Sequence, residues 1–126
     1  MFDGKLNKFC KEANDRASEK GFWDDMDISL QVIDSNTKSN DIISAVKDAF
    51  IAQKVALIMS ECGESLDAMR EDNYGLEKKD SFEDELADVF IRLADLCGEM
   101  KIDIEKQITW KMNYNADREA KHGKSF

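Results

Sequence analysis

The spacing of apolar residues along the chain predicts helices. Between about 41 and 72 apolar side chains recur every three or four residues, which places them on one face of a long helix. The same spacing predicts helices over about 3–20, about 81–99 and from about 103 toward 121, while 28–34 fits a short helix or an irregular cover. No stretch alternates apolar and polar residues long enough for a sheet. We therefore expect an all-α fold of the antiparallel four-helix-bundle type.

Local signals indicate where these helices begin and end. Gly75 can adopt the left-handed conformation that ends a helix, so it is expected to close the long one. Asp80 followed by Glu83 is typical of a capping box and predicts the start of the next helix, which Gly98 then interrupts. Asp103 is expected to cap the last helix.

Composition and charge narrow the class of protein. A chain of 126 residues can form a single domain over 1–126 with its own core. Its formal charge of -9 disfavours nucleic acid and anionic membranes as partners. The longest apolar run, 55–59, is too short to span a membrane, and the N-terminus has no apolar signal segment, so we expect a soluble cytoplasmic protein. Cys10, Cys62 and Cys97 are widely spaced, which favours reduced thiols.

Two acidic pairs lie on the two central predicted helices. They are Glu61 with Glu64, and Glu85 with Asp88. Residues three apart project from one helical face, and both pairs border the apolar stripe. If these helices pack antiparallel, four carboxylates converge and repel one another unless a cation neutralises them. Because hard oxygen ligands suit hard ions, the pairs predict a site for Mg²⁺, with Mn²⁺ as a possible substitute.

Cationic and amide side chains form one face of the last predicted helix. Lys111, Asn115, Arg118 and His122 recur at steps of four, three and four. Such donors beside a metal cluster suit a ligand with several phosphates. The alternative is a helical interaction module without catalysis, because single acidic pairs are often ordinary solvated surface.

Five further residues are candidates for the same site. Arg92 and Asp95 continue the face of the second acidic pair, so they could contact substrate or support the metal ligands, although Arg92 could instead pair with an acid one turn earlier. Phe22 and Trp23 could stack on a nucleobase or belong to the core. Lys54, two turns before the first acidic pair, could face the cleft or be solvated.

These motifs resemble the MazG-like all-α nucleoside triphosphate pyrophosphohydrolases, in particular their small phage- and integron-type branch. The hallmark of that family is ExxE, a spacer and then ExxD, and here twenty residues separate Glu64 from Glu85. The resemblance extends over the segments 21–25, 57–70, 82–96 and 111–126. One departure is Ser60, where many relatives have another glutamate.

The resemblance implies hydrolysis of a nucleoside triphosphate between its α and β phosphates, which gives the monophosphate and pyrophosphate. The four paired carboxylates would coordinate Mg²⁺, and either Glu64 or Glu61 would accept the proton of the attacking water. Lys111, Asn115 and Arg118 would bind phosphate oxygens. Apolar faces too large for one small bundle predict a homodimer or homotetramer with sites near subunit interfaces. The base and the sugar of the substrate stay open.

Overall fold

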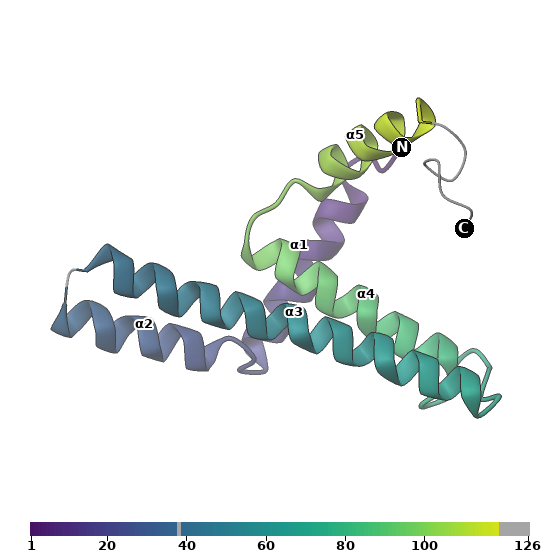
Figure 1. The fold of residues 1–126 in the computed structure, drawn as a ribbon, viewed down its shortest axis with the longest axis horizontal. Helices are drawn as coiled ribbons and strands as arrows, with labels where there is room; N and C mark the ends of the chain where they lie inside the picture. Colours follow the sequence, from purple (N-terminus) through teal and green to yellow (C-terminus); the bar gives the residue numbers. More distant parts are fainter. Residues whose placement is uncertain (38, 119–126) are drawn as a thin grey trace.

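The chain forms five α-helices in a computed structural model that describes residues 1–37 and 39–118 (Figure 1). They are α1 (Lys5–Glu19), α2 (Asp24–Asn36), α3 (Asn40–Arg70), α4 (Phe82–Glu99) and α5 (Ile104–Ala116). The described residues contain no strand, so the predicted all-α class is confirmed. The segment 28–34, which the sequence left open, lies within α2.

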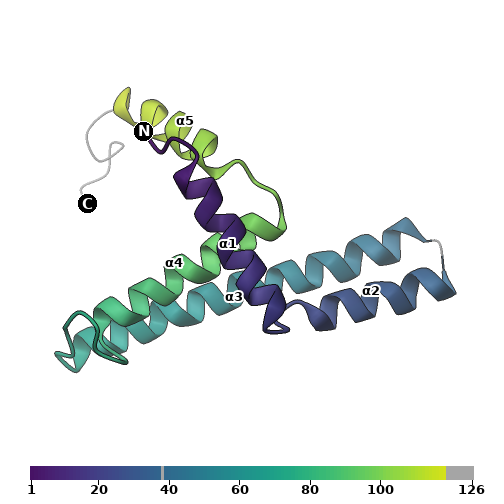
Figure 2. The same ribbon diagram turned by 180° about the vertical axis from the view of Figure 1, so that it is seen from behind.

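The long helix α3 has a different neighbour along each half (Figures 1 and 2). Helix α2 runs antiparallel to its first half, and α4 runs antiparallel to its second half. Helix α1 packs across α4, and α5 lies beside the N-terminal part of α1. The antiparallel α3–α4 pair that the sequence predicted is therefore present, and it brings the two acidic motifs onto facing helices.

The start of α4 differs from the predicted capping box by one residue. Ser81 is the N-cap: its hydroxyl accepts the Asp84 N–H at 3.2 Å and donates to the Gly75 carbonyl at 2.8 Å. The Asp84 carboxylate accepts the Asp80 N–H at 2.8 Å. Glu83 instead accepts the Gly75 N–H at 2.7 Å and so closes the preceding loop. The predicted capping box of Asp80 and Glu83 was wrong. Ser81, the next residue, is in the position to cap the helix.

At the end of α3 the prediction was wrong, and at the start of α5 it was correct. The left-handed residue that closes α3 is Asp72, with φ of 55°, and the next N–H, of Asn73, bonds back into the last turn. Gly75 therefore does not supply that conformation, contrary to the prediction. Asp103 does cap α5, because its carboxylate accepts the Lys106 N–H at 3.2 Å.

The core consists of two clusters of buried side chains centred on the contact of α1 with α4. One contains Cys10, Ala13, Ala94 and Cys97, and the other contains Ala17, Trp23, Met26 and Leu96. Gly98 lies inside α4 at the closest approach of the two helices, since a Cβ atom there would stand 2.4 Å from the Cys10 carbonyl oxygen. Its predicted role as a helix interruption was wrong. Gly98 instead lets the two backbones touch, and this contact fixes the position of α4.

Large apolar side chains remain exposed on the outer faces of α2, α3 and α4. Examples are Ile28 and Val32 on α2, Met59 on α3, and Phe90 on α4. Among the described residues, no helix combines the length and the apolar character needed to cross a bilayer.

Candidate functional site

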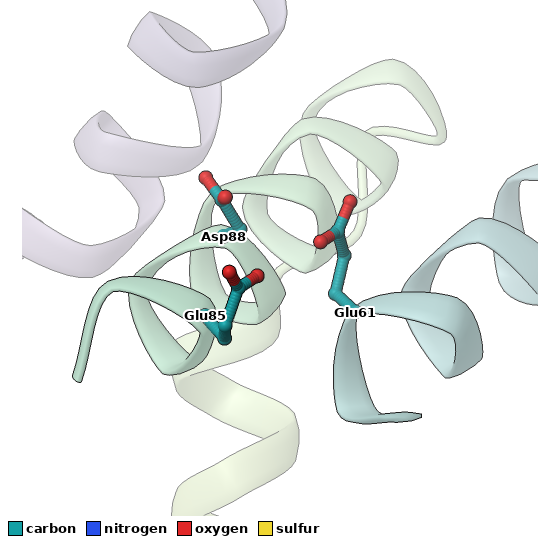
Figure 3. Close-up of side chains that lie close together, drawn as sticks. All are labelled: Glu61, Glu85 and Asp88. Carbon is teal, nitrogen blue, oxygen red and sulfur yellow. The ribbon is translucent and has the colours of Figure 1, made fainter. Parts of the chain in front are cut away.

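Three acidic side chains point toward one another between α3 and α4 (Figure 3). Glu61 projects from α3, and Glu85 and Asp88 project from α4; each offers a carboxylate oxygen within 4.8 Å of the others. Glu61 is 7 % exposed, Glu85 is 5 % exposed and Asp88 is half-buried. A solvated acidic surface would leave such groups in water. The structure thus brings together three of the four predicted ligands in a shielded position.

The fourth predicted ligand, Glu64, lies at the exposed edge of this cluster. Burial, followed by the hydrogen bond and negative charge of Glu64, raises the pKa of Glu85 above its usual value. The charge of Asp88 acts in the same direction. A cation held among these carboxylates would favour their ionised forms, so the chemistry of the donor set fits a hard divalent ion.

Arg92 links the two helices at the same point. Its guanidinium Nε donates to Glu61 Oε1 across the α3–α4 contact. The sequence suggested a partner for Arg92 one turn earlier on its own helix. The structure gives it a carboxylate of the facing helix. Arg92 supplies positive charge directly beside the acidic cluster.

A pocket of about 230 Å³ adjoins the carboxylates. Asp88 belongs to both the cluster and the pocket wall, and Arg92, which donates to Glu61 of the cluster, also lines the wall. The wall is formed by Ala17, Phe22, Lys54, Leu57, Asp88, Ile91, Arg92 and Asp95. Apolar side chains with a few charged groups at the rim are typical of a small-molecule site. The pocket therefore offers room for a ligand that also reaches the acidic cluster.

The two adjacent aromatic residues have different surroundings. Trp23 is 1 % exposed, and its indole N–H donates to Asp95 Oδ1 at 2.8 Å, an oxygen that also accepts Asn14 Nδ2 at 3.0 Å. Trp23 thus belongs to the core, and Asp95 holds it there while lining the pocket. Phe22 is 59 % exposed and lies on the pocket wall, so its ring is available to a ligand.

Lys54 lies at the pocket, which is one of the two places that the sequence allowed for it, whereas the sequence did not single out Asn14. The Lys54 ammonium stands 4.5 Å from the centroid of the Trp23 ring and donates to the Phe22 carbonyl, which holds it at the pocket. The spacing of two helical turns between Lys54 and Glu61 is the sequence signal that made Lys54 a candidate. For Asn14 the signal was an amide beside the buried stripe of α1, where a polar side chain needs a partner.

The cationic face of α5 is not brought to the carboxylates within one chain. Lys111, Asn115 and Arg118 are exposed, and α5 lies beside α1, away from the α3–α4 acidic cluster (Figures 1 and 2). Lys111 and Arg118 lie over the ring of Tyr114, at 5.0 and 5.7 Å from its centroid. His122 lies outside the described residues.

A second acidic group occurs at the start of α4. Asp80, Asp84 and Glu85 also offer oxygens within 4.8 Å of one another. Here Lys79 contacts Asp80 at 2.9 Å and Asp84 at 3.1 Å. The Asp80 N–H and then Lys79 lower the pKa of Asp84, and both carboxylates raise that of Lys79. Asp80 and Asp84 thus have a backbone N–H and a lysine as partners, and these contacts stabilise the start of α4.

Comparison with known proteins gives one match. The family model described as MazG nucleotide pyrophosphohydrolase domain matches residues 52–120, more than half of the chain. This segment contains both acidic pairs, the pocket residue Lys54 and the cationic face of α5. No curated protein and no solved structure shows a significant match.

Proposed function

The chain belongs to the family of MazG nucleotide pyrophosphohydrolase domains, and we propose that it hydrolyses nucleoside triphosphates, ribose or deoxyribose, to the monophosphate and pyrophosphate with Mg²⁺ as cofactor. The observation that carries this proposal is the convergence of Glu61, Glu85 and Asp88 in a shielded position between two helices. Buried carboxylates that face one another are costly in a protein without a positive counter-charge. Arg92 offsets the charge of Glu61, and a bound cation would offset the charges of Glu85 and Asp88.

The ligand set that we assign to the metal is Glu61, Glu64, Glu85 and Asp88. All four offer hard oxygen donors, which suit Mg²⁺ and also Mn²⁺. When bound, the ion would neutralise phosphate charge and polarise the bond to be broken. The pKa of Glu85 is raised first by burial and then by Glu64 and Asp88, and a bound cation would offset both the lost hydration and the repulsion.

We assign the role of general base to Glu64, with Glu61 as the second candidate. Glu64 is exposed beside Glu85, where a water molecule can reach its carboxylate, whereas Glu61 is held by Arg92. Glu64 would take the proton of the attacking water as its oxygen bonds to phosphorus. The bond between the bridging oxygen and the α phosphorus would then break, or the corresponding bond to the β phosphorus, and in either case the products are the monophosphate and pyrophosphate.

The nucleoside part of the substrate fits the pocket beside Asp88. Phe22 offers an exposed ring on which a base can stack. Lys54 and Arg92 supply positive charge between the pocket and the carboxylates, close to where the phosphates of a bound nucleotide would lie. Asp95 contributes to this wall and keeps Trp23 in place, so we assign it a positioning role.

We further propose that a second copy of the chain supplies Lys111, Asn115 and Arg118. Lys111 and Asn115 lie on α5 and Arg118 lies just beyond its end, in a part of the chain that packs beside α1 and is distant from the acidic cluster. The exposed apolar side chains of α2 and α4 are available to bury in a homodimer or in a dimer of dimers. In such an assembly α5 of one copy can approach the acidic cluster of the other, where its donors would bind phosphate oxygens.

A substrate panel tests the proposed activity. The protein is incubated with each nucleoside and deoxynucleoside triphosphate and Mg²⁺, and the products are separated by anion-exchange chromatography. Monophosphate with pyrophosphate is the expected pair, and chelation of Mg²⁺ should stop its formation. Release of orthophosphate would contradict the proposed bond, and lack of turnover on every nucleotide would favour the interaction module.

Mixing two inactive variants tests the contribution of a second copy. One variant carries Glu85→Gln, and the other carries Lys111→Ala together with Arg118→Ala. If α5 acts on the partner's site, a mixed dimer has one site with both sets of residues intact, so co-expressed subunits should recover about a quarter of the wild-type activity. No recovery, with mixed dimers confirmed by affinity tags, would place the cations in the same chain as the acids they serve.

A further inference from the structure

Two thiols that are far apart in the sequence meet in the core. Cys10 on α1 is 4 % exposed and Cys97 on α4 is 5 % exposed, and both belong to the same buried cluster. The two side chains therefore lie in one small cluster with Ala13 and Ala94. The third cysteine, Cys62, is exposed on α3. The wide spacing in the sequence gave no indication of this pair, because only the packing of α1 on α4 creates it.

The backbone geometry at this point is unusual for two packed helices. Helix axes ordinarily lie roughly 8–10 Å apart, whereas a disulfide needs Cα atoms about 4.4–6.8 Å apart. Gly98, the residue after Cys97, lets α4 touch α1 so closely that a Cβ atom on it would stand 2.4 Å from the Cys10 carbonyl oxygen. The glycine therefore allows the backbones of α1 and α4 to approach closely beside the two cysteines.

The pair is also reachable from outside. Cys10 and Cys97 both line a surface pocket of about 480 Å³, together with Asn14, Gly98 and Lys101. A small thiol reagent can enter through this pocket without opening the core. Burial raises the pKa of both thiols, so their reaction should be slower than that of an exposed cysteine.

We propose that Cys10 and Cys97 are a modification site that forms an intrachain disulfide by exchange with a low-molecular-weight disulfide such as oxidised glutathione. The thiolate of one cysteine attacks the small disulfide, which gives a mixed disulfide and releases one small thiol. The other cysteine then attacks the protein sulfur of the mixed disulfide and releases the second small thiol. The two protein thiols lose two electrons and two protons, and the small disulfide gains them.

The test uses the folded full-length chain carrying Cys62→Ser, which removes the exposed thiol. The protein is equilibrated in oxidised glutathione, free thiols are alkylated, and the intact mass is measured. The expected product is a monomeric chain that is about 2 Da lighter and takes up no alkylating reagent, with a peptide that joins the two cysteines. Because the bond closes a long loop, the melting temperature should rise by roughly 10 °C and return on reduction.

Two matched variants serve as controls in the same background. Cys10→Ala and Cys97→Ala each leave one thiol, so neither can show the mass loss or the rise in melting temperature; circular dichroism verifies that they fold. The proposal is overturned if the parent protein keeps both thiols open to alkylation after denaturation, or if it gains glutathione on both cysteines instead of joining them.

Discussion

The two acidic groups of α4 share Glu85 but have opposite surroundings. Toward the start of the helix, Asp80 and Asp84 are matched by the Lys79 ammonium and by a backbone N–H. Toward the middle, Glu85 faces Glu61 and Asp88, which are themselves carboxylates (Figure 3). In the first group both Asp80 and Asp84 contact Lys79, whereas in the second Arg92 pairs with Glu61, and Glu85 lies beside further carboxylates.

This difference concerns the partners of the acidic residues and not their number, and it is our reason for proposing a metal site at one group and a helix start at the other. Both groups bring three carboxylates within the same distance of one another. The pKa of Asp84 is lowered by its neighbours, whereas that of Glu85 is raised by burial and by Glu64. Asp84 and Glu85 are adjacent in sequence, yet the folded chain stabilises the charged form of the first and disfavours that of the second.

Replacing single carboxylates by amides should give the largest difference between the two groups, and the difference should appear in kcat/KM. Glu85→Gln or Asp88→Asn should lower kcat/KM by roughly a thousandfold or more, because each removes a proposed metal ligand. The matched variant Asp84→Asn keeps an oxygen for the Asp80 N–H and should stay within about threefold of wild type. Steady-state assays on one nucleotide check both values. A loss in Asp84→Asn equal to that in Glu85→Gln would remove the distinction.

Metal binding should distinguish the groups in stability. At a Mg²⁺ concentration a hundredfold above its dissociation constant, the wild-type protein should gain about 2.7 kcal/mol against unfolding. Glu61→Gln should lose most of that gain, whereas Asp80→Asn should retain it. Thermal melts with and without Mg²⁺ measure the shift for each protein. A gain that persists in Glu61→Gln and vanishes in Asp80→Asn would move the ion to the start of the helix.

The capping residue should affect folding and leave the chemistry unchanged. Ser81 is completely buried, caps α4 and donates to the Gly75 carbonyl, so Ser81→Ala should cost about 1–2 kcal/mol of unfolding free energy. Urea denaturation measures that cost. The value of kcat at a temperature where the variant is folded should equal that of wild type, and a fall in kcat would show that the helix start takes part in the site.

The smallest effect is expected in the metal-free protein as pH changes. Since the pKa of Glu85 is raised in the folded state, its contribution favours folding below the ordinary glutamate pKa and is lost as pH rises through the raised value. Glu85→Gln should therefore stabilise the metal-free chain at pH 7 and give little change near pH 4. Asp84 has a lowered pKa, so the stability it contributes at pH 7 is lost as pH falls through that lowered value. Urea titrations at pH 7 and near pH 4 check the sign for Glu85, and titrations continued below the ordinary aspartate pKa check the sign for Asp84.

The helices and the acidic pairs could be predicted because their signals are local. Apolar spacing marks α3 and α4, and residues three apart on a helix necessarily share a face, which holds for Glu61 with Glu64 and for Glu85 with Asp88. The short connection between the helices then favours antiparallel packing. These three steps were enough to predict that carboxylates from both motifs meet.

The remaining features depend on contacts between distant parts of the chain. Spacing placed Arg92 on the acidic face of α4 but could not show that its partner is Glu61 on the facing helix. Asp95 was a candidate for substrate, yet its bonds to Trp23 and Asn14 arise from the packing of α1 and its following turn. Competition between neighbours explains the capping error, because Asp80 and Ser81 both suit an N-cap and the loop geometry selects the serine.

The length of α3 has a consequence for how nucleotides would be selected. Lys54 at the pocket and Glu61 at the carboxylates lie on one unbroken helix, seven positions apart. Seven residues make almost two complete turns, so the helix fixes the direction of both side chains and an axial separation of about 10 Å. The site would then select nucleotides by the distance between the base and the phosphates as well as by the base itself. Inserting one alanine between them would rotate Lys54 by about 100° relative to Glu61 and uncouple the two halves of the site without altering either.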